Sequence, residues 1–302
     1  MKREVDLSVV ILSFNTNALL RETLAAVYKS RLGRYVLEVI VCDNGSTDGS
    51  VGLVRKEFPA TTVIELKKNL GFAAGNNPGI RKASGRYILL LNSDTEVSAD
   101  AFSVMIGFMD KRPDAGAATC KLILPDGSID PACHRGFPSP RAALSYFLGL
   151  EKLFPASRFF GEYHQGYKNR TTVHDVDCIS GAFFLVRREV VTRVGYLDED
   201  YYFYGEDMDW AFRIRRAGWT IAYNPTVTVL HKKKQSGRAH ADENRRLRTE
   251  YYFYKYNKLF YKKNYASRYP GAVMRLIYFL FDIRMFFIKR RLAQAERNVQ
   301  LA

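Results

Sequence analysis

Short apolar runs alternate with amphipathic stretches through the first 125 residues. The apolar runs predict strands at residues 7–13, 37–43, 62–66, 87–91 and 117–124. The stretches between them predict helices at residues 17–30, 49–58, 71–83 and 99–111. Because continuous apolar strands that alternate with helices are typical of a parallel sheet covered on both faces, the pattern predicts an α/β fold.

The pattern loosens between residues 125 and 175, where four prolines interrupt a segment rich in aromatic and basic residues. We interpret this segment as a variable region over the ligand-binding face of the sheet. Regular patterns return as a strand-like run at 176–186, a helix at 206–217, and strands at 219–223 and 226–230.

Polar motifs follow the predicted strand ends, where ligands bind in parallel α/β sheets. Asp43 begins the turn-rich sequence 43–48, in which Gly45 permits a positive φ. This turn either only caps the next helix or places the Asp43 carboxylate on the ring N–H of a uracil or thymine. The motif Asn69-Leu70-Gly71 begins a helix whose small residues allow either close packing or a close approach by a ligand.

Asn92-Ser93-Asp94 directly follows the apolar run 87–91. A carboxylate at the end of a buried strand either caps the next helix or supplies an oxygen ligand to a divalent cation. We favour metal ligation by Asp94, because metal–diphosphate sites form at this edge of such sheets.

The sequence 205–210 places three acidic residues at the beginning of a predicted helix. Such residues suit the helix dipole, and one can also act as a base. Asp207 and Asp209 lie about 200° apart on an ideal helix, so they point to opposite faces. We therefore expect one aspartate to be catalytic and the other structural, paired with Arg213 or another basic residue of this helix. His231 ends the last strand before a lysine cluster and is a candidate contact for a diphosphate or its metal.

The motifs resemble, in order and over residues 7–236, those of the family 2 glycosyltransferases of the GT-A fold, especially the bacterial rhamnosyltransferase-like branch. They are residues 12–15, 43–48, 69–76, 92–94, 181–184 and 205–210. The resemblance implies a GT-A (Rossmann-like), mostly parallel sheet flanked by helices. It divides residues 1–236 into a nucleotide-sugar half, at about 1–125, and an acceptor half, at about 126–236. It also implies an inverting sugar transfer from a nucleotide-diphospho-sugar.

The resemblance also implies roles for single residues. Donor binding falls to Asn15, Asp43, Asn69, Gly71, Asn92, Ser93 and His231. Asp94, with His231, is implied to hold Mg²⁺ or Mn²⁺ on the diphosphate. Asn92 stands where the first Asp of the family's DxD-type motif often stands, which leaves strict metal dependence open. Asp207 is implied to be the base that deprotonates the acceptor hydroxyl, in a site bordered by Gly181, Ala182 and Glu206.

Charge separates the last part of the chain from the rest. Residues 231–302 hold 18 Lys+Arg and 5 Asp+Glu, a net charge of +13 out of the total of +15. Aromatic and aliphatic residues are mixed with these bases at 251–256 and 274–289, which predicts a helical tail over 237–302 that binds an anionic membrane surface. Nucleic acid or a protein partner are the competing interpretations of the tail.

The remaining sequence features concern localisation. No stretch reaches the roughly 18–20 apolar residues of a spanning helix, and Met1–Asp6 with the short apolar run after it lacks the features of a signal peptide. The four scattered cysteines form no CxxC motif and are expected to be free thiols. We therefore expect a cytoplasmic protein that lies peripherally on the inner face of the plasma membrane.

The leading hypothesis is a glycosyltransferase of bacterial cell-surface glycan synthesis that uses dTDP-rhamnose and a polyprenyl-diphosphate-linked or polysaccharide acceptor. Another family 2 transferase that uses a UDP- or GDP-sugar is the first alternative. A nucleotidyltransferase would need a Gly/Lys phosphate loop near the N-terminus, which residues 12–17 lack. A nucleic-acid-binding protein would have no use for Asp94 or Asp207, and the near-neutral body argues against a nucleic-acid partner.

Overall fold

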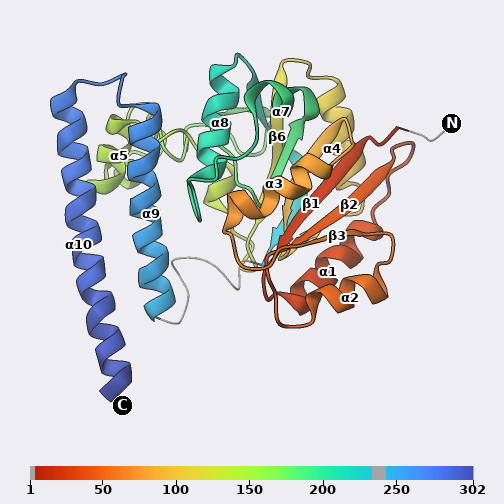
Figure 1. Ribbon diagram of the computed structural model, residues 1–302. Helices are drawn as coiled ribbons and strands as arrows, with labels where there is room; N and C mark the ends of the chain where they lie inside the picture. The colour runs from red at the N-terminus through yellow and green to blue at the C-terminus, as the bar shows by residue number, and fades with distance from the viewer. Residues whose placement is uncertain (1–3, 233–242, 302) are drawn as a thin grey trace.

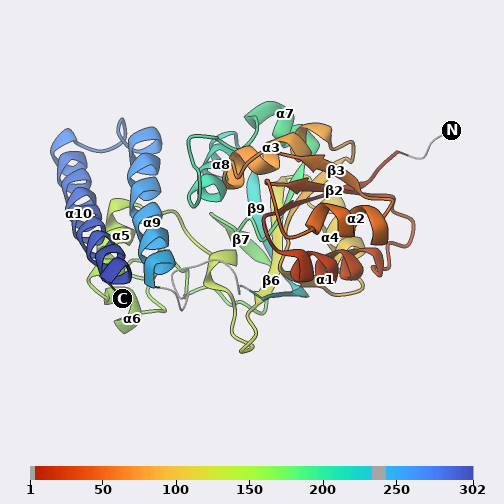
Figure 2. The same cartoon turned by 60° about the horizontal axis from the view of Figure 1, so that its bottom comes forward.

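A computed structural model of the chain describes residues 4–232 and 243–301. Within these ranges nine strands form one sheet in the order β3-β2-β1-β4-β8-β6-β9-β5, with β7 paired to β9. Helices α3, α7 and α8 lie on one side of this sheet, and α1, α2 and α4 lie on the other (Figures 1 and 2). The protein therefore has the expected α/β architecture, with an additional helical pair at its C-terminal end.

The N-terminal half of the sheet is parallel, as its continuous apolar runs predict. Its strands are β1 (Leu7–Ser13), β2 (Leu37–Asp43), β3 (Thr62–Glu65) and β4 (Tyr87–Asn92). The helices between them and after them are α1 (Asn17–Tyr28), α2 (Ser50–Glu57), α3 (Phe72–Lys82) and α4 (Ala101–Asp110). The register aligns Ser13 with Asp43 and Leu12 with Asn92, so the motifs that follow these strands lie at one edge of the sheet.

The second half of the sheet mixes orientations. Its strands are β5 (Thr95–Val97), β6 (Ala115–Ile123), β7 (His174–Val176), β8 (Phe183–Arg187) and β9 (Thr220–His231). The helices α7 (Arg188–Val194) and α8 (Glu206–Arg216) lie between β8 and β9 along the chain. Strand β8 is antiparallel to β4 and β6, whereas β9 is parallel to β6 and antiparallel to β5. The β5–β9 register aligns Thr95 with His231, and this brings the end of the chain's last strand to the turn after β4.

Two sequence-based predictions of strands need correction. The run 176–186 is not one strand, because β7 ends at Val176 and β8 begins at Phe183. The predicted strands 219–223 and 226–230 are one strand, β9, whose register with β6 shifts after Asn224. The shift falls at Pro225, which has no N–H to donate to a neighbouring strand, so the chain bulges there and then resumes pairing.

The irregular segment 125–175 contains more structure than the sequence predicts. It forms a 3₁₀ turn η1 (Pro131–Cys133) and the helices α5 (Pro140–Phe147) and α6 (Leu150–Leu153). Pro131 and Pro140 occupy the first turn of their elements, where the missing N–H has no partner to lose. Two of the four prolines that interrupt the pattern therefore mark the beginning of a helical element.

The C-terminal region forms two long helices, α9 (Glu243–Asn264) and α10 (Gly271–Leu301), which run side by side (Figure 1). The aromatic run 251–256 was expected at a membrane surface, but Tyr254 and Tyr256 are buried. The ring centroid of Tyr256 lies 5.9 Å from that of Tyr201, which belongs to the loop that precedes α8. Helix α9 thus packs against the sheet-containing body, and it is α10 that lies at the outside.

Some expectations fall outside the described residues, namely Lys233 and Lys234 of the lysine cluster and the proposed domain boundary at residues 236–237. The four cysteines are buried free thiols, as the sequence predicts. Among the described residues, none of the helices combines the length and the hydropathy that are needed to cross a membrane.

Candidate active site

The site lies at the edge where β1, β2 and β4 end, and its first component is Asp43. This carboxylate is 3% exposed, and its Oδ2 accepts a hydrogen bond from the backbone N–H of Ser46 at 2.9 Å. Within the described part of the chain, Oδ1 is buried and has no hydrogen-bond partner. Because buried carboxylate oxygens are normally paired, this free acceptor suits a ligand N–H such as that of a pyrimidine base.

Asn15 lies beside this carboxylate but uses its side chain within the protein. Its backbone has a positive φ of 51°, and its Oδ1 accepts from the Thr47 N–H at 2.8 Å. The Asn15 N–H in turn donates to Ser46 Oγ at 3.0 Å. Asn15 therefore joins the loop after β1 to the loop after β2, and any contact with the donor stays a prediction.

Asn69 and Gly71 shape the loop that precedes α3. Asn69 Oδ1 accepts from the Gly71 N–H at 2.9 Å and from Asn44 Nδ2 at 3.0 Å. Gly71 has a φ of +84°, and a Cβ at this position would lie 2.2 Å from the backbone oxygen of Tyr202. Packing against the loop before α8 therefore explains this glycine, and its contact with the donor stays a prediction.

Asp94 and His231 face each other at the turn between β4 and β5. Asp94 Oδ1 lies 3.4 Å from His231 Nε2, and the two residues are 7% and 5% exposed. Asn92 Nδ2 lies 3.4 Å from the same imidazole nitrogen. The pair is placed by the β5–β9 register and by a hydrogen bond of 2.8 Å from the Lys232 N–H to the Asp94 backbone oxygen.

These two side chains fit a divalent cation. Oxygen and imidazole nitrogen are both suitable ligands, and two ligands at about 2.0–2.3 Å from one ion lie about 3 Å apart. No group of three or more His, Cys, Asp or Glu side chains that could hold a metal occurs in residues 4–232 and 243–301. An ion between Asp94 and His231 would therefore complete its coordination with diphosphate oxygens and water, which is usual for Mg²⁺.

The other nitrogen of His231 is held by a residue that the sequence analysis missed. Asp130 is fully buried, and its Oδ2 lies 2.8 Å from His231 Nδ1. Without a metal, burial alone lowers the pKa of His231, but its hydrogen bonds to Asp130 and Asp94 outweigh burial and raise that pKa to about 9. A cation bound at Nε2 would displace the proton from that nitrogen.

Ser93 was predicted to contact the donor, and the structure gives it partners on α1. Its Oγ accepts from Thr16 Oγ1 at 3.1 Å, and its backbone oxygen accepts from Thr23 Oγ1 at 2.9 Å. Both contacts hold the turn after β4 in place. A donor contact by Ser93 stays a prediction.

The acidic cluster begins α8, with Gly205 in the left-handed conformation at its N-cap. Glu206 is 6% exposed, and its Oε2 lacks a hydrogen-bond partner among the described residues. Burial and the adjacent charge of Asp207 raise the pKa of Glu206 to about 8. Asp207 is half-buried and its Oδ2 accepts from Arg135 Nη2 at 3.1 Å. A protonated Glu206 carboxyl can therefore stand beside Asp207 at neutral pH.

Asp209 points away from this pair, as the helical geometry predicts. Its Oδ2 accepts from Arg213 Nε at 2.7 Å, and its Oδ1 accepts from Asn264 Nδ2 at 3.0 Å. The predicted pairing of one aspartate with Arg213 is confirmed. Asp209 is thus a structural link between α8 and α9.

The loop 180–182 lies beside Asn92, which ends β4. The Asn92 N–H donates to the Ala182 backbone oxygen at 3.2 Å. A Cβ on Gly181 would lie 2.7 Å from the Phe72 ring, so this glycine lets α3 approach the loop. Whether Gly181 and Ala182 border the acceptor stays a prediction.

Comparison with known proteins now gives the family. The family model for glycosyl transferase family 2 matches residues 8–195. The chain belongs to this family. It is 28% identical over 211 residues to an N-acetylglucosaminyl-diphospho-decaprenol L-rhamnosyltransferase of Mycobacterium tuberculosis, and the match covers 66% of this chain and 68% of that protein.

A second relative and two solved structures extend the comparison. The chain is 27% identical over 221 residues to a poly-beta-1,6-N-acetyl-D-glucosamine synthase of Staphylococcus aureus, covering 72% of this chain and 48% of the synthase. The S. aureus TarS 1–349 complex with UDP-GlcNAc has a TM-score of 0.58 at 17% identity, covering 93% of this chain and 73% of TarS 1–349. Mannosyltransferase PcManGT of Pyrobaculum calidifontis, solved with GDP-Man and Mn²⁺, has a TM-score of 0.58 at 18% identity. The match covers 98% of this chain and 76% of the mannosyltransferase chain. The protein is therefore a family 2 glycosyltransferase with the GT-A fold.

Proposed function

We propose that this enzyme transfers a sugar, with inversion, from a nucleotide-diphospho-sugar to a hydroxyl of a polyprenyl-diphosphate-linked or polysaccharide acceptor in cell-surface glycan synthesis. The observation that carries the proposal is the facing pair Asp94–His231, with an oxygen and a nitrogen 3.4 Å apart at the edge of the sheet. Rhamnose from dTDP-rhamnose is the favoured donor, supported by the name of the mycobacterial relative. A UDP- or GDP-sugar is the alternative, since neighbours were solved with UDP-GlcNAc and GDP-Man.

The donor is bound by its two ends. The free Oδ1 of Asp43 accepts the ring N–H of the base, and the diphosphate lies at Asp94 and His231. Mg²⁺ or Mn²⁺ held there would stabilise the negative charge that develops on the leaving nucleotide diphosphate. Asp207 takes the proton of the acceptor hydroxyl, and the hydroxyl oxygen bonds to the anomeric carbon as the bond to the diphosphate breaks. Glu206, with its carboxyl protonated, donates a hydrogen bond to the acceptor.

A donor screen tests this proposal. The purified enzyme is incubated with dTDP-rhamnose, UDP-GlcNAc or GDP-mannose, a polyprenyl-diphosphate-linked N-acetylglucosamine acceptor, and Mg²⁺ or Mn²⁺. Transfer from dTDP-rhamnose, and its loss in Asp207→Asn, is the expected result. Efficient transfer from another nucleotide sugar alone would replace rhamnose as the donor, and turnover that is unchanged in Asp207→Asn would remove this residue from the role of base.

We also propose that the enzyme binds the anionic inner face of the plasma membrane through α10. This helix is apolar on two opposite sides, of which one packs on the protein through Met274, Phe281 and Ile288. The other side carries apolar residues that are each more than half exposed, namely Leu276, Phe279, Leu280, Phe286 and Phe287. Exposed bases accompany them: Arg275, Arg284, Lys289, Arg290 and Arg291. An exposed apolar stripe flanked by Lys and Arg is the pattern of a helix that lies in a membrane interface.

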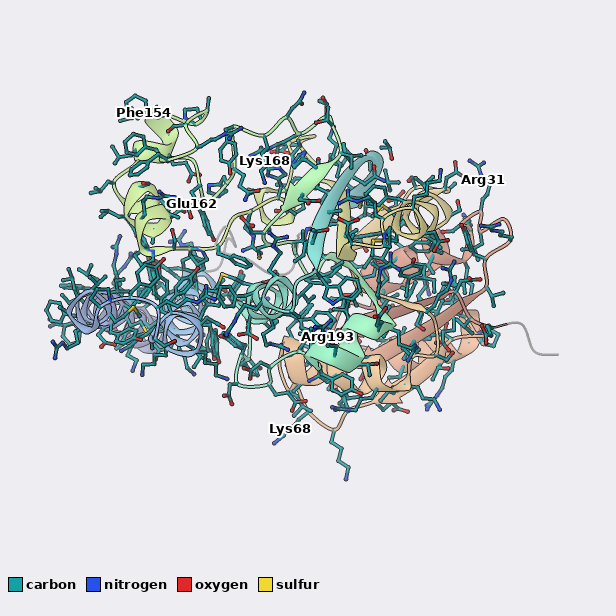
Figure 3. The ribbon with its side chains drawn as sticks, turned by 90° about the horizontal axis from the view of Figure 1, so that it is seen from above. Arg31, Lys68, Phe154, Glu162, Lys168 and Arg193 are labelled. Atoms are coloured by element: carbon teal, nitrogen blue, oxygen red, sulfur yellow. The ribbon has the colours of Figure 1, made fainter. Side chains whose placement is uncertain are left out.

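A second exposed apolar group supports the same orientation. It lies on and after α5 and α6 and contains Leu144, Phe147, Leu148, Leu153 and Phe154. Phe147 and Tyr254 have ring centroids 6.3 Å apart, so α5 contacts α9. Phe154 lies at the same end of the molecule as α9 and α10, away from the sheet (Figure 3). The acceptor half and the helical pair therefore present apolar side chains at one end of the protein.

Surface substitutions test membrane binding better than deletion, because removing α9 would also remove Asn264 from Asp209. The triple variant Leu276→Ser, Phe279→Ser, Leu280→Ser should lose flotation with vesicles that contain anionic lipid. Val104→Ser on α4, also an exposed apolar residue, is the matched control and should float like the wild type. Flotation should weaken as salt rises, because the Debye length falls to about 3 Å near 1 M. Equal flotation of the triple variant and the control would refute the role of α10.

A further inference from the structure

One short segment, Asp130–Arg135, reaches both halves of the candidate site. We propose that it positions the imidazole of His231, a proposed metal ligand, through Asp130. Through Arg135 it positions the carboxylate of Asp207, the proposed base, so that one short stretch of backbone orients both groups. The inference rests on the proposed function for the roles of His231 and Asp207, but it concerns residues that neither the motifs nor the comparisons assign.

Asp130 is the metal-side end of this segment. One carboxylate oxygen lies 2.8 Å from His231 Nδ1, and the other accepts from the Ala132 N–H at 3.0 Å. Its backbone N–H donates to Leu122 of β6 at 2.9 Å, so the carboxylate is fixed to the sheet. A carboxylate on one imidazole nitrogen sets the ring orientation and leaves the other nitrogen to the ligand. Here that other nitrogen, Nε2, faces Asp94 Oδ1 at 3.4 Å.

Arg135 is the base-side end. Its Nη2 donates to Asp207 Oδ2 at 3.1 Å, and its Nε donates to the Ala132 backbone oxygen at 3.0 Å. Its backbone pairs with Cys178 in both directions, at 3.1 and 2.9 Å. These contacts fix the guanidinium independently of Asp207. Its hydrogen bond to Oδ2 therefore favours one orientation of the Asp207 carboxylate. The side chains of Arg135 and Asp207 are only 15% and 17% exposed, so water competes little for this contact.

The residues between these two ends anchor the segment. Cys133 and His134 are fully buried, and the Cys133 N–H donates to the Asp130 backbone oxygen at 3.1 Å. The 3₁₀ turn Pro131–Cys133 thus separates Asp130 from Arg135 by a rigid spacer. A shift of this turn would move both positioning contacts together. A fixed spacer of this kind suits a reaction in which the leaving diphosphate and the attacking hydroxyl must be aligned on opposite sides of one carbon.

The test of Asp130 uses metal binding and needs no turnover. Calorimetry measures binding of dTDP or UDP with and without Mn²⁺ to the wild type, to Asp130→Asn, and to Asp126→Asn as a matched control on the exposed turn before it. Asp130→Asn should weaken Mn²⁺ binding in the presence of nucleotide by roughly 10–100-fold, the range for removing a ligand's orienting partner. Nucleotide binding without metal should not change. If Mn²⁺ enhances nucleotide binding by folded Asp130→Asn as much as by the wild type, this half of the proposal is overturned. If the Asn variant does not fold, Asp130→Glu replaces it, because Glu keeps the charge but moves it.

The test of Arg135 uses kinetics with the donor that the screen identifies. Arg135→Ala should lower kcat about 100-fold, the cost of misplacing a reacting group by about 1 Å, while KM for the donor changes little. Millimolar guanidinium should restore part of the lost kcat, which it cannot do for a merely destabilised enzyme. Arg141→Ala is the matched control, because Arg141 forms an exposed ion pair with Glu162. Unchanged kcat in Arg135→Ala, or a fall that guanidinium and Arg135→Lys both leave uncorrected, would overturn the proposal.

Failure of the inference can be told apart from failure of the proposed function. If wild-type enzyme and Asp207→Asn are equally inactive with all donors, the proposed function fails and the Asp130 calorimetry still reports on the metal-side contact. If the wild type is active and both positioning variants behave like their controls, only the inference fails.

Discussion

Replacing Asp209 by Ala should destabilise the enzyme, whereas replacing Asp207 by Asn should inactivate it without destabilising it. The two residues are neighbours on α8 but face different surroundings. Asp209 has a side chain that is 3% exposed and bonds to Arg213 and Asn264. Within residues 4–232 and 243–301, the hydrogen bond that Asp207 receives from another element is that of Arg135, at 3.1 Å.

The magnitude follows from what Asp209→Ala leaves behind. Removing one partner of a buried ion pair typically costs about 3–5 kcal/mol, because the remaining charge stays buried. The Arg213 guanidinium keeps hydrogen bonds to the backbone oxygens of Val194 and Tyr196, and its side chain is 27% exposed. Both features reduce the penalty, so we expect the lower limit, about 3 kcal/mol. For a chain of this size such a loss lowers Tm by about 6–12 °C.

Thermal unfolding followed by circular dichroism gives Tm for the wild type and both variants, and initial rates give kcat. Asp207→Asn should keep Tm within about 2 °C of the wild type, because the isosteric amide keeps an oxygen that can accept the hydrogen bond from Arg135. A stable but inactive Asp209→Ala, together with an active Asp207→Asn, would refute the assignment of the two faces. Asn264→Leu offers a further check, since it removes the link to α9 and should lower Tm without abolishing donor binding.

Three further predictions test other parts of the site. Asp94→Ala should abolish the enhancement of nucleotide diphosphate binding by Mn²⁺ in calorimetry, and equal enhancement in variant and wild type would exclude Asp94 as a ligand. The pKa of Glu206 is raised from 4.5 to about 8, so the folded state keeps a proton that the unfolded chain loses and the free energy of unfolding falls between these pH values. Glu206→Gln should therefore gain stability relative to the wild type as pH rises from 5 to 9 in urea denaturation, and a difference independent of pH would contradict the shift. Gly71→Ala should cost about 2 kcal/mol or more in the same assay, because its Cβ meets the Tyr202 backbone at positive φ, whereas Gly33→Ala, with φ +59° and open space, should cost only about 1 kcal/mol.

The parallel half of the fold could be predicted from the sequence because its signals are local. The strands β1, β2 and β4 are largely apolar runs followed by polar residues, and the register of the sheet then aligns those polar residues without further information. Asp43, at the end of such a run, and Asp94, three residues after one, could be singled out as candidates in this way. The opposite orientations of Asp207 and Asp209 could also be predicted, because they depend only on the period of one helix.

The partners of these residues could not be predicted, because they depend on contacts between distant parts of the chain. Asp130 meets His231 across 101 positions, and Arg135 meets Asp207 across 72. Neither residue lies in a periodic element, and an Asp before Pro131 indicates only a turn. The same limit applies to the tail, where the aromatic residues of α9 have the sequence pattern of an interfacial group but contact the loop before α8, α5 and α10.

This difference has a consequence for the chemistry of the site. The groups with recognisable motifs are those that would touch the donor or the acceptor, and they lie on loops after strands or at a helix beginning. Two of them, His231 and Asp207, are contacted from the irregular segment 125–175, through Asp130 and Arg135. This segment also carries α5 and α6 and their exposed apolar side chains. A membrane-bound acceptor that displaces α5 or α6 would therefore act on the same segment that holds His231 and Asp207. Substitutions of Asp130 or Arg135 should therefore change the rate of transfer, although neither residue is expected to contact a substrate.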